Sequence, residues 1–272
     1  MGLVHCRRVW RGCGSAAYSA EMSDKNAAVA DHLFSDARLA ALYDLFCAGR
    51  KDFDFYLPQI MAAQSVLDIG CGTGALLHLA RDNGHAGRLC GLDPAPGMLE
   101  QARRRGDIEW VLGDLSTKGW QGAFELAVMT GHAFQVLLDD ADIRAALDAV
   151  RAALVPGGCF AFETRNPLKR EWERWTTARP AEVTDGDGTV VRLSRAVQTP
   201  VVGERVSFTH TFTSPSWDRP QTSQSTLRFV SMETLARLLG EAGYRIEAQF
   251  GDWDASPLTA ASTEIITFAR PI

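Results

Sequence analysis

VLDIGCGTG, residues 66–74, is the stretch that decides the fold of this chain. The run SVLDI, residues 65–69, has the apolar composition of a buried strand, and ALLHLA, residues 75–80, begins a helix. Gly70, Gly72 and Gly74 therefore form a turn from strand to helix, where the backbone needs unusual φ angles and close approach to a ligand. This pattern predicts a doubly wound α/β sheet with a nucleotide-like cofactor at the turn.

Two classes of cofactor bind at a turn of this kind. Gly70, Gly72 and Ala75 also fit the dinucleotide pattern G-x-G-x-x-G/A, so an NAD-dependent oxidoreductase is one interpretation. Asp68 favours another, because a carboxylate two residues before the first glycine attracts a cationic amino group and repels a pyrophosphate. We therefore expect a cofactor that carries an amine.

The order D-x-G-x-G-x-G, from Asp68 to Gly74, resembles motif I of the class I S-adenosylmethionine-dependent methyltransferases. The resemblance implies a Rossmann-like sheet of seven strands with an antiparallel last strand, and S-adenosyl-L-methionine as cofactor. Acids recur where the family needs them at the ends of the next two strands. Asp93, 23 residues after Gly70, is expected to bind the ribose hydroxyls. Asp114 is expected to accept a hydrogen bond from the exocyclic amine of adenine.

The cofactor-binding residues implied by this resemblance are Asp68, Gly70, Cys71, Gly72, Gly74, Asp93, Pro94, Met98, Asp114, Leu115 and Thr130. Met98 offers a polarisable thioether for the purine face, and ordinary core packing is its other reading. The turn VPGG, residues 155–158, before the fifth strand is a further hallmark of the family. The resemblance covers about residues 64–165.

Chemistry is expected in the segment from Thr130 to Gln135, which in the family lies beside the methionine part of the cofactor. His132 is the candidate catalytic base for a hydroxyl acceptor, whereas an amine acceptor needs no base. A contact with the cofactor or the backbone is the simpler role for His132. Arg165, at the end of the fifth strand, is a candidate partner for a substrate carboxylate or phosphate, or else forms an ion pair with Glu171 or Glu173.

Three aromatic residues are further candidates for contact with the substrate. A stripe at helical spacing, Leu39, Leu42, Tyr43 and Phe46, predicts an amphipathic helix over the cofactor site. Tyr43 and Tyr56 in these N-terminal helices are substrate candidates, and so is Trp253 near the mouth, where it would stack on a flat or cationic acceptor. Core packing is the alternative for each of the three.

The chain divides into five parts in this interpretation. A leader expected to be disordered, or an upstream extension of a start at Met22, occupies residues 1–21. Capping helices follow at residues 22–63, and the cofactor-binding core at residues 64–165. An antiparallel β lid for the substrate occupies residues 166–230, and the closing helix and strands occupy residues 231–272. Three strands are expected in the lid, at residues 189–197, 204–213 and 224–230.

Composition narrows the choice of function. The 272 residues carry a net charge of −5, which argues against a nucleic-acid partner. Neither a membrane span nor a zinc-like spacing of the six cysteines and six histidines is present, so we expect no membrane partner and no metal. The cysteines suit the reducing cytoplasm.

We therefore predict a cytoplasmic methyltransferase that acts on nitrogen or oxygen of a small molecule. The alternatives are an NAD-dependent oxidoreductase and a regulatory protein that binds the cofactor without turnover. The oligomeric state stays open.

Overall fold

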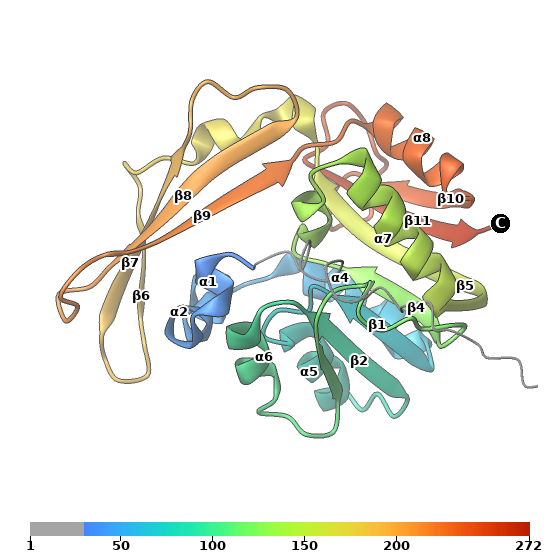
Figure 1. The fold of residues 1–272 in the computed structure, drawn as a ribbon, viewed down its shortest axis with the longest axis horizontal. Coiled ribbons are helices and arrows are strands. Elements are labelled where there is room, and N and C mark those ends of the chain that lie inside the picture. Colours follow the sequence, from blue (N-terminus) through green and yellow to red (C-terminus); the bar gives the residue numbers. More distant parts are fainter. Residues whose placement is uncertain (1–29) are drawn as a thin grey trace, which may run out of the picture.

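A computed structural model describes residues 30–272, and its core is a seven-stranded sheet (Figure 1). The strands lie in the order β10-β11-β5-β4-β1-β2-β3. β11 is antiparallel to both of its neighbours, and the other neighbouring pairs are parallel. The predicted Rossmann-like sheet with its antiparallel last strand is confirmed. The strand bounds are Ser65–Ile69 (β1), Arg88–Asp93 (β2), Glu109–Leu112 (β3), Phe124–Met129 (β4), Leu154–Arg165 (β5), Tyr244–Phe250 (β10) and Glu264–Pro271 (β11).

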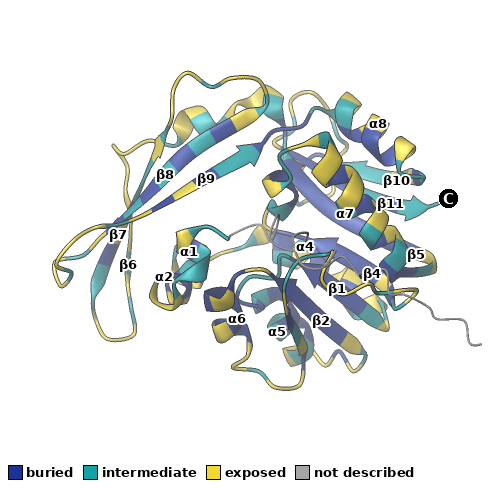
Figure 2. Ribbon diagram, viewed as in Figure 1, coloured by how far each residue is buried: buried dark blue, intermediate teal, exposed yellow. Residues whose placement is uncertain are grey.

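Helices cover both faces of this sheet. α7 (Asp140–Ala153) and α8 (Met232–Glu241) pack on one face, in a cluster that includes Leu67 of β1. α4 (Lys51–Ala62) and α5 (Ala75–Asp82) pack on the other face, in a cluster that includes Val66. Successive residues of one strand thus face opposite layers, as the two-residue period of a strand requires. Figure 2 shows the resulting buried band through β1, β4 and β5.

The switch in strand order lies at β1, which has β4 on one side and β2 on the other. In doubly wound sheets, ligands bind at the carboxyl ends of the strands on either side of such a switch. Helix α6 (Pro96–Ala102) follows β2 and lies at the same end of the sheet. The fold therefore brings the ends of β1, β2 and β4 together around the glycine turn.

The N-terminal helices differ from the prediction. The stripe expected as one amphipathic helix is divided between α2 (Ala37–Ala41) and α3 (Tyr43–Phe46), and α1 (His32–Ser35) precedes them. The helix breaks at Leu42, whose N–H bonds to the carbonyl of Leu39 three residues back. Both halves nevertheless contact the same two neighbours, since Leu39 and Phe46 pack with the second sheet, and Ala40 and Tyr43 pack with Met98 of α6. Residues 1–29, which hold the predicted leader and the start of the capping segment, lie outside the described residues.

A second, antiparallel sheet is inserted between β5 and α8. Its strands are β6 (Ala181–Thr184), β7 (Val190–Val197), β8 (Arg205–Thr213) and β9 (Gln221–Arg228), in that spatial order. Three strands were predicted and four are present, because β6 is a short, largely exposed edge strand without an apolar signal. Figure 1 shows this sheet extending away from the core, with α1 and α2 beside it.

Short 3₁₀ helices complete the chain. η1 (Ala133–Val136) follows β4, and η2 (Pro167–Lys169) and η3 (Glu171–Arg174) connect β5 to the second sheet. Within residues 30–272, no helix is both long enough and apolar enough to cross a bilayer.

Candidate active site

The glycine turn is built as the spacing predicted. Gly70, Gly72 and Gly74 all have positive φ, at 71°, 56° and 74°. A Cβ added to Gly74 would lie 2.3 Å from the indole of Trp110, so this glycine permits close packing of the turn. A Cβ on Gly72 would meet only the sulfur of Met98, at 4.0 Å. The backbone of Gly72 therefore borders open space, which suits close approach of a ligand.

Asp68 is the most unusual side chain at the turn. It lies in β1 and is 1% exposed, and its Oδ1 has no hydrogen-bond partner among the described residues. Burial raises its pKa to about 7, although the positive charge of Arg50 opposes that shift. An unpaired buried polar atom is costly in free energy. The cationic amine of a ligand would satisfy this carboxyl, so the residue fits the role predicted for it.

Asp93 ties the end of β2 to the glycine turn. Its Oδ2 accepts the N–H of Gly72 and its Oδ1 accepts the N–H of Ala95, both at 2.8 Å. Each oxygen keeps a second lone pair. The carboxylate is therefore held in one orientation and can still accept hydroxyl groups. Its predicted contact with ribose stays a prediction.

Asp114 and Leu115 lie in the loop after β3. Asp114 Oδ1 accepts from the N–H and hydroxyl of Ser116 and from the hydroxyl of Thr117, which closes the loop on itself. Leu115 is partly buried against the main core. One oxygen of Asp114 is thus used locally, a detail that the spacing of the motif did not predict. Its adenine contact also stays a prediction.

The N-terminal helices lie against the turn. Met98 is 2% exposed and packs with Ala40, Ala95 and Tyr43. The hydroxyl of Thr73 donates to Asp44 at 2.8 Å, which links α3 directly to the glycine loop. Burial raises the pKa of the Tyr43 phenol above its usual range. Of the other predicted cofactor residues, Pro94 is exposed and Cys71 is half-buried at the turn itself.

Arg50 lies beside Gly131 and close enough to Asp68 for its charge to act there, and the sequence did not predict it. Its guanidinium lies 3.0 Å from a Cβ placed on Gly131, the residue two positions after β4. Its Nε donates to Asp52 at 2.9 Å, and its charge acts on Asp68. A single arginine in GRKDF, residues 49–53, has no sequence signature, so only the fold could find it.

The segment after β4 forms a buried network with two glutamates. His132 has a left-handed backbone, at φ 63°, and its N–H donates to Glu163 Oε1 at 2.7 Å. The hydroxyl of Tyr56 donates to the other oxygen of Glu163 at 2.7 Å. Tyr56 is fully buried, so its contacts favour the packing role over a direct contact with substrate. Thr130, one of the predicted cofactor residues, is buried at the end of β4.

The imidazole of His132 is held by Glu264. Its Nε2 lies 2.9 Å from Glu264 Oε2, and its side chain is 17% exposed. Burial, together with the charge of Arg165, lowers the pKa of His132 to about 3. Burial also raises the pKa of Glu264 to about 8. The two groups are in contact and titrate as a unit. We expect the pair to lose its shared proton near pH 8, leaving Nδ1 of His132 as a free acceptor.

Glu163 and Glu264 were missed, although a signal for them exists. Both are acids inside apolar strands, in FAFETR, residues 160–165, and STEIITF, residues 262–268. An acid in a buried strand needs a partner, so it marks either a structural network or a site.

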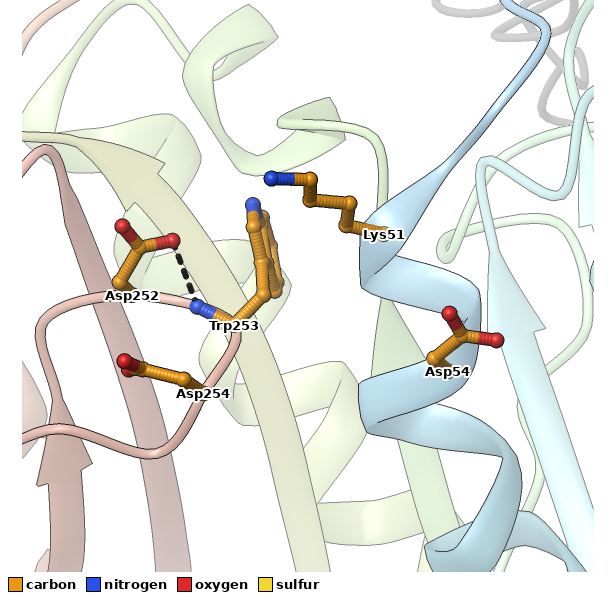
Figure 3. Close-up of a pocket in the computed structure, with 5 residues that line it drawn as sticks. All are labelled: Lys51, Asp54, Asp252, Trp253 and Asp254. Atoms are coloured by element: carbon orange, nitrogen blue, oxygen red, sulfur yellow. Dashed lines mark hydrogen bonds between the residues drawn. The ribbon is translucent and has the colours of Figure 1, made fainter.

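Trp253 borders the same region. Its ring centre lies 6.2 Å from that of Tyr56 and 6.5 Å from that of His132. On the surface beside it lies a pocket of about 360 Å³. Its lining combines Trp253 with one lysine and three acids, namely Lys51, Asp54, Asp252 and Asp254 (Figure 3). Trp253 thus lies between the His132 network and an acidic surface pocket.

Arg165 lies at the end of β5, with its side chain 18% exposed. Its Nη1 donates to Gln135 Oε1 at 2.8 Å, and its Nε lies 2.9 Å from Glu171. The ion pair with Glu171, one of the two interpretations of this residue, is therefore present. Among residues 30–272, no three His, Cys, Asp or Glu side chains are grouped to hold a metal ion.

Comparison with known proteins finds methyltransferases similar to this chain. Residues 66–158 match the family described as a methyltransferase domain. A malonyl-[acyl-carrier protein] O-methyltransferase of Hahella chejuensis is 33% identical over 131 residues, which is 46% of each chain. The chain thus spans about half the length of the curated relatives it matches.

Two solved structures share the fold at low identity. An S-adenosylmethionine-dependent methyltransferase from Clostridium acetobutylicum has a TM-score of 0.69 at 18% identity, over 86% of this chain and 98% of that one. A sugar N-methyltransferase from Streptoalloteichus has a TM-score of 0.65 at 19% identity, over 95% of this chain and 100% of that one. Its methyltransferase domain at residues 66–158, its D-x-G-x-G-x-G turn and its strand order thus make the chain similar to the class I S-adenosylmethionine-dependent methyltransferases.

Proposed function

We propose that this protein transfers a methyl group from S-adenosyl-L-methionine to nitrogen or oxygen of a small molecule. The buried, unpartnered carboxyl of Asp68 is the observation that carries the proposal. It lies at the glycine turn, where the amino group of this cofactor would satisfy it, and where the pyrophosphate of NAD would meet a repelling charge.

The other cofactor contacts follow from the same turn. Arg50, whose charge acts on Asp68, is suited to the carboxylate of the cofactor's amino-acid tail. Asp93 would hold the ribose and Asp114 the adenine amine, with Met98 under the purine. The sulfonium of S-adenosylmethionine supplies a methyl group that is already activated for displacement. The chain contributes mainly alignment, worth about 7–11 kcal/mol when reacting groups are held near contact.

His132 is our candidate base for a hydroxyl acceptor. When Glu264 is ionised it accepts the Nε2–H of the ring, and Nδ1 is then the atom left to take a proton from the acceptor. A neutral amine acceptor would need only to be aimed, and His132 would then orient it. The acceptor itself would lie between Arg165, Tyr43 and His132, with the second sheet as the lid.

The partner we propose is a small molecule rather than a nucleic acid, since a net charge of −5 offers little attraction for a phosphate backbone. The cysteines Cys47, Cys71, Cys90 and Cys159 are free thiols, which suits a cytoplasmic location.

Titration calorimetry with S-adenosylmethionine, S-adenosylhomocysteine and NAD tests the proposal. We expect the two sulfur cofactors to bind and NAD not to bind. Tight uptake of NAD alone would overturn the proposal in favour of an oxidoreductase. Transfer of a labelled methyl group to an acceptor then separates an enzyme from a regulatory protein that only binds the cofactor.

A further inference from the structure

Two arginines from different sheets lie against one tryptophan. Arg165 ends β5 of the core, Arg195 lies in β7 of the second sheet, and Trp175 follows η3 between them in sequence. The guanidinium carbons of Arg165 and Arg195 lie 5.5 Å and 5.8 Å from the centre of the Trp175 ring. Both distances are within the range of a cation–π contact. Like charges are thus gathered at a flat aromatic surface.

The charges of this group are not balanced by the described residues. Arg165 has Glu171 as its ion-pair partner, at 2.9 Å. Arg195 has no carboxylate within 4.0 Å in residues 30–272, although it is half-buried. Burial and the charge of Arg165 lower the pKa of Arg195. The three charged groups therefore sum to one positive charge.

His210 does not supply the missing charge. Arg195 Nε donates to His210 Nε2 at 2.9 Å, so that nitrogen acts as an acceptor and the imidazole is neutral. Burial, with the charge of Arg195, lowers the pKa of His210 to about 3, in agreement with this assignment. A neutral ring fixes the direction of the guanidinium without compensating its charge.

The group also lies beside the reaction site. The charge of Arg165 acts on His132, and the charge of Arg195 acts on Cys47 and on Tyr43 of α3. The arginines therefore stand between the end of β5, the helices over the cofactor turn and the second sheet.

We propose that Arg165 and Arg195 bind a carboxylate group of the methyl acceptor, with Trp175 holding the two guanidinium groups at one place. This inference rests on the proposed function and names the substrate class for the same site. Guanidinium groups match a carboxylate in shape and charge. A monoanion would neutralise the single excess charge, whereas a phosphate dianion would leave an excess negative charge next to the buried Glu163 and Glu264. The proposed substrate is thus a carboxylic acid with a single negative charge.

Small probes test the charge requirement directly. Benzoate and benzamide have the same shape and differ in charge, and their binding can be measured by ligand-observed NMR on the full chain, with and without S-adenosylhomocysteine. We expect benzoate to bind at least about tenfold more tightly than benzamide, the scale of a charge-assisted contact. Arg195→Gln should abolish this preference. Arg192→Gln is the matched control, because Arg192 lies in the same strand, is exposed and pairs with Glu182.

Glu171→Gln should change benzoate binding in the opposite direction to Arg195→Gln. It frees Arg165 from its carboxylate partner, so we expect benzoate to bind more tightly than in the wild type. This arm keeps the test decisive if Arg195→Gln does not fold. Equal binding of benzoate and benzamide by the wild type, or a benzoate preference that survives in folded Arg195→Gln, would overturn the inference. Failure to bind S-adenosylmethionine would instead count against the proposed function, since the probe preference is measured without cofactor as well.

Discussion

Replacing Asp68 by Asn removes one negative charge from the glycine turn and keeps the shape of the side chain. The wild-type carboxyl is 1% exposed, and its pKa is raised to about 7 by burial. If its ionised form pairs with the amino group of the cofactor, the chain must release a proton on binding below pH 7. We therefore expect the affinity for S-adenosylmethionine to rise with pH up to about 7 and then to level off.

The size of the effect follows from this shift. Each pH unit below 7 should weaken binding about tenfold, because each unit costs about 1.4 kcal/mol to ionise the carboxyl. Loss of a hydrogen bond to a charged group costs about 1.5–3 kcal/mol. Asp68→Asn should accordingly bind the cofactor about 10- to 150-fold more weakly at pH 7.5. Its affinity should also lose the pH dependence.

Stability should change in the opposite sense. An acid with a raised folded-state pKa contributes stability below its unfolded value of 3.8 and loses it as pH rises through the folded value of about 7. For Asp68 this loss amounts to about 4 kcal/mol of the free energy of unfolding without cofactor. The Asn variant should not show this loss, so weaker binding would not reflect misfolding.

Calorimetry between pH 5.5 and 7.5 measures the affinity, and urea denaturation measures the free energy of unfolding. Asp187→Asn is the matched control, since Asp187 is an exposed carboxylate in the turn between β6 and β7. An affinity that is flat over this pH range, or an Asp68→Asn variant that binds as tightly as the wild type at pH 7.5, would refute the reasoning.

Three other substitutions test the rest of the site. Asp93→Ala should weaken cofactor binding by roughly 1.5–3 kcal/mol, as measured by calorimetry. It should also lower the free energy of unfolding, because the N–H groups of Gly72 and Ala95 lose their acceptor. An unchanged affinity for the cofactor would show that the ribose binds elsewhere. Glu264→Gln should remove the titration near pH 8 that we expect in the NMR signals of the His132 ring, and persistence of that step would assign it to another group. Gly74→Ala should cost about 2–5 kcal/mol in urea denaturation, from positive φ and overpacking against Trp110. Gly122→Ala is the control, because Gly122 also has a positive φ but has open space around it, so this variant should lose less free energy of unfolding. Equal losses in the two variants would show that the Trp110 side chain moves to make room for the added methyl group.

The placement of the residues proposed to bind the cofactor was predictable because they are tied to strand ends. In a parallel sheet, all carboxyl ends meet at one edge, so the acids at the ends of the first strands had to converge near the glycine turn. Asp68 and Asp93 lie there, and the seven-stranded order follows the same logic. Asp114 shows the limit of this reasoning, because local bonds to Ser116 and Thr117 use one of its oxygens.

The substrate half depends on contacts between distant segments. Glu264 meets His132 across 132 residues of sequence, and Tyr56 meets Glu163 across 107. No local pattern encodes such pairs. The partner of the N-terminal stripe has the same origin, since Leu39, Leu42 and Phe46 pack with a sheet whose strands come more than 150 residues later in the sequence than Leu39.

The most direct measurement is a crystal structure of the chain with S-adenosylhomocysteine. Our account predicts the amino group of the ligand within hydrogen-bonding distance of the Asp68 carboxylate, about 2.7–3.2 Å. A ligand whose amino-acid tail points away from Asp68, with that carboxyl still unpartnered, would contradict it.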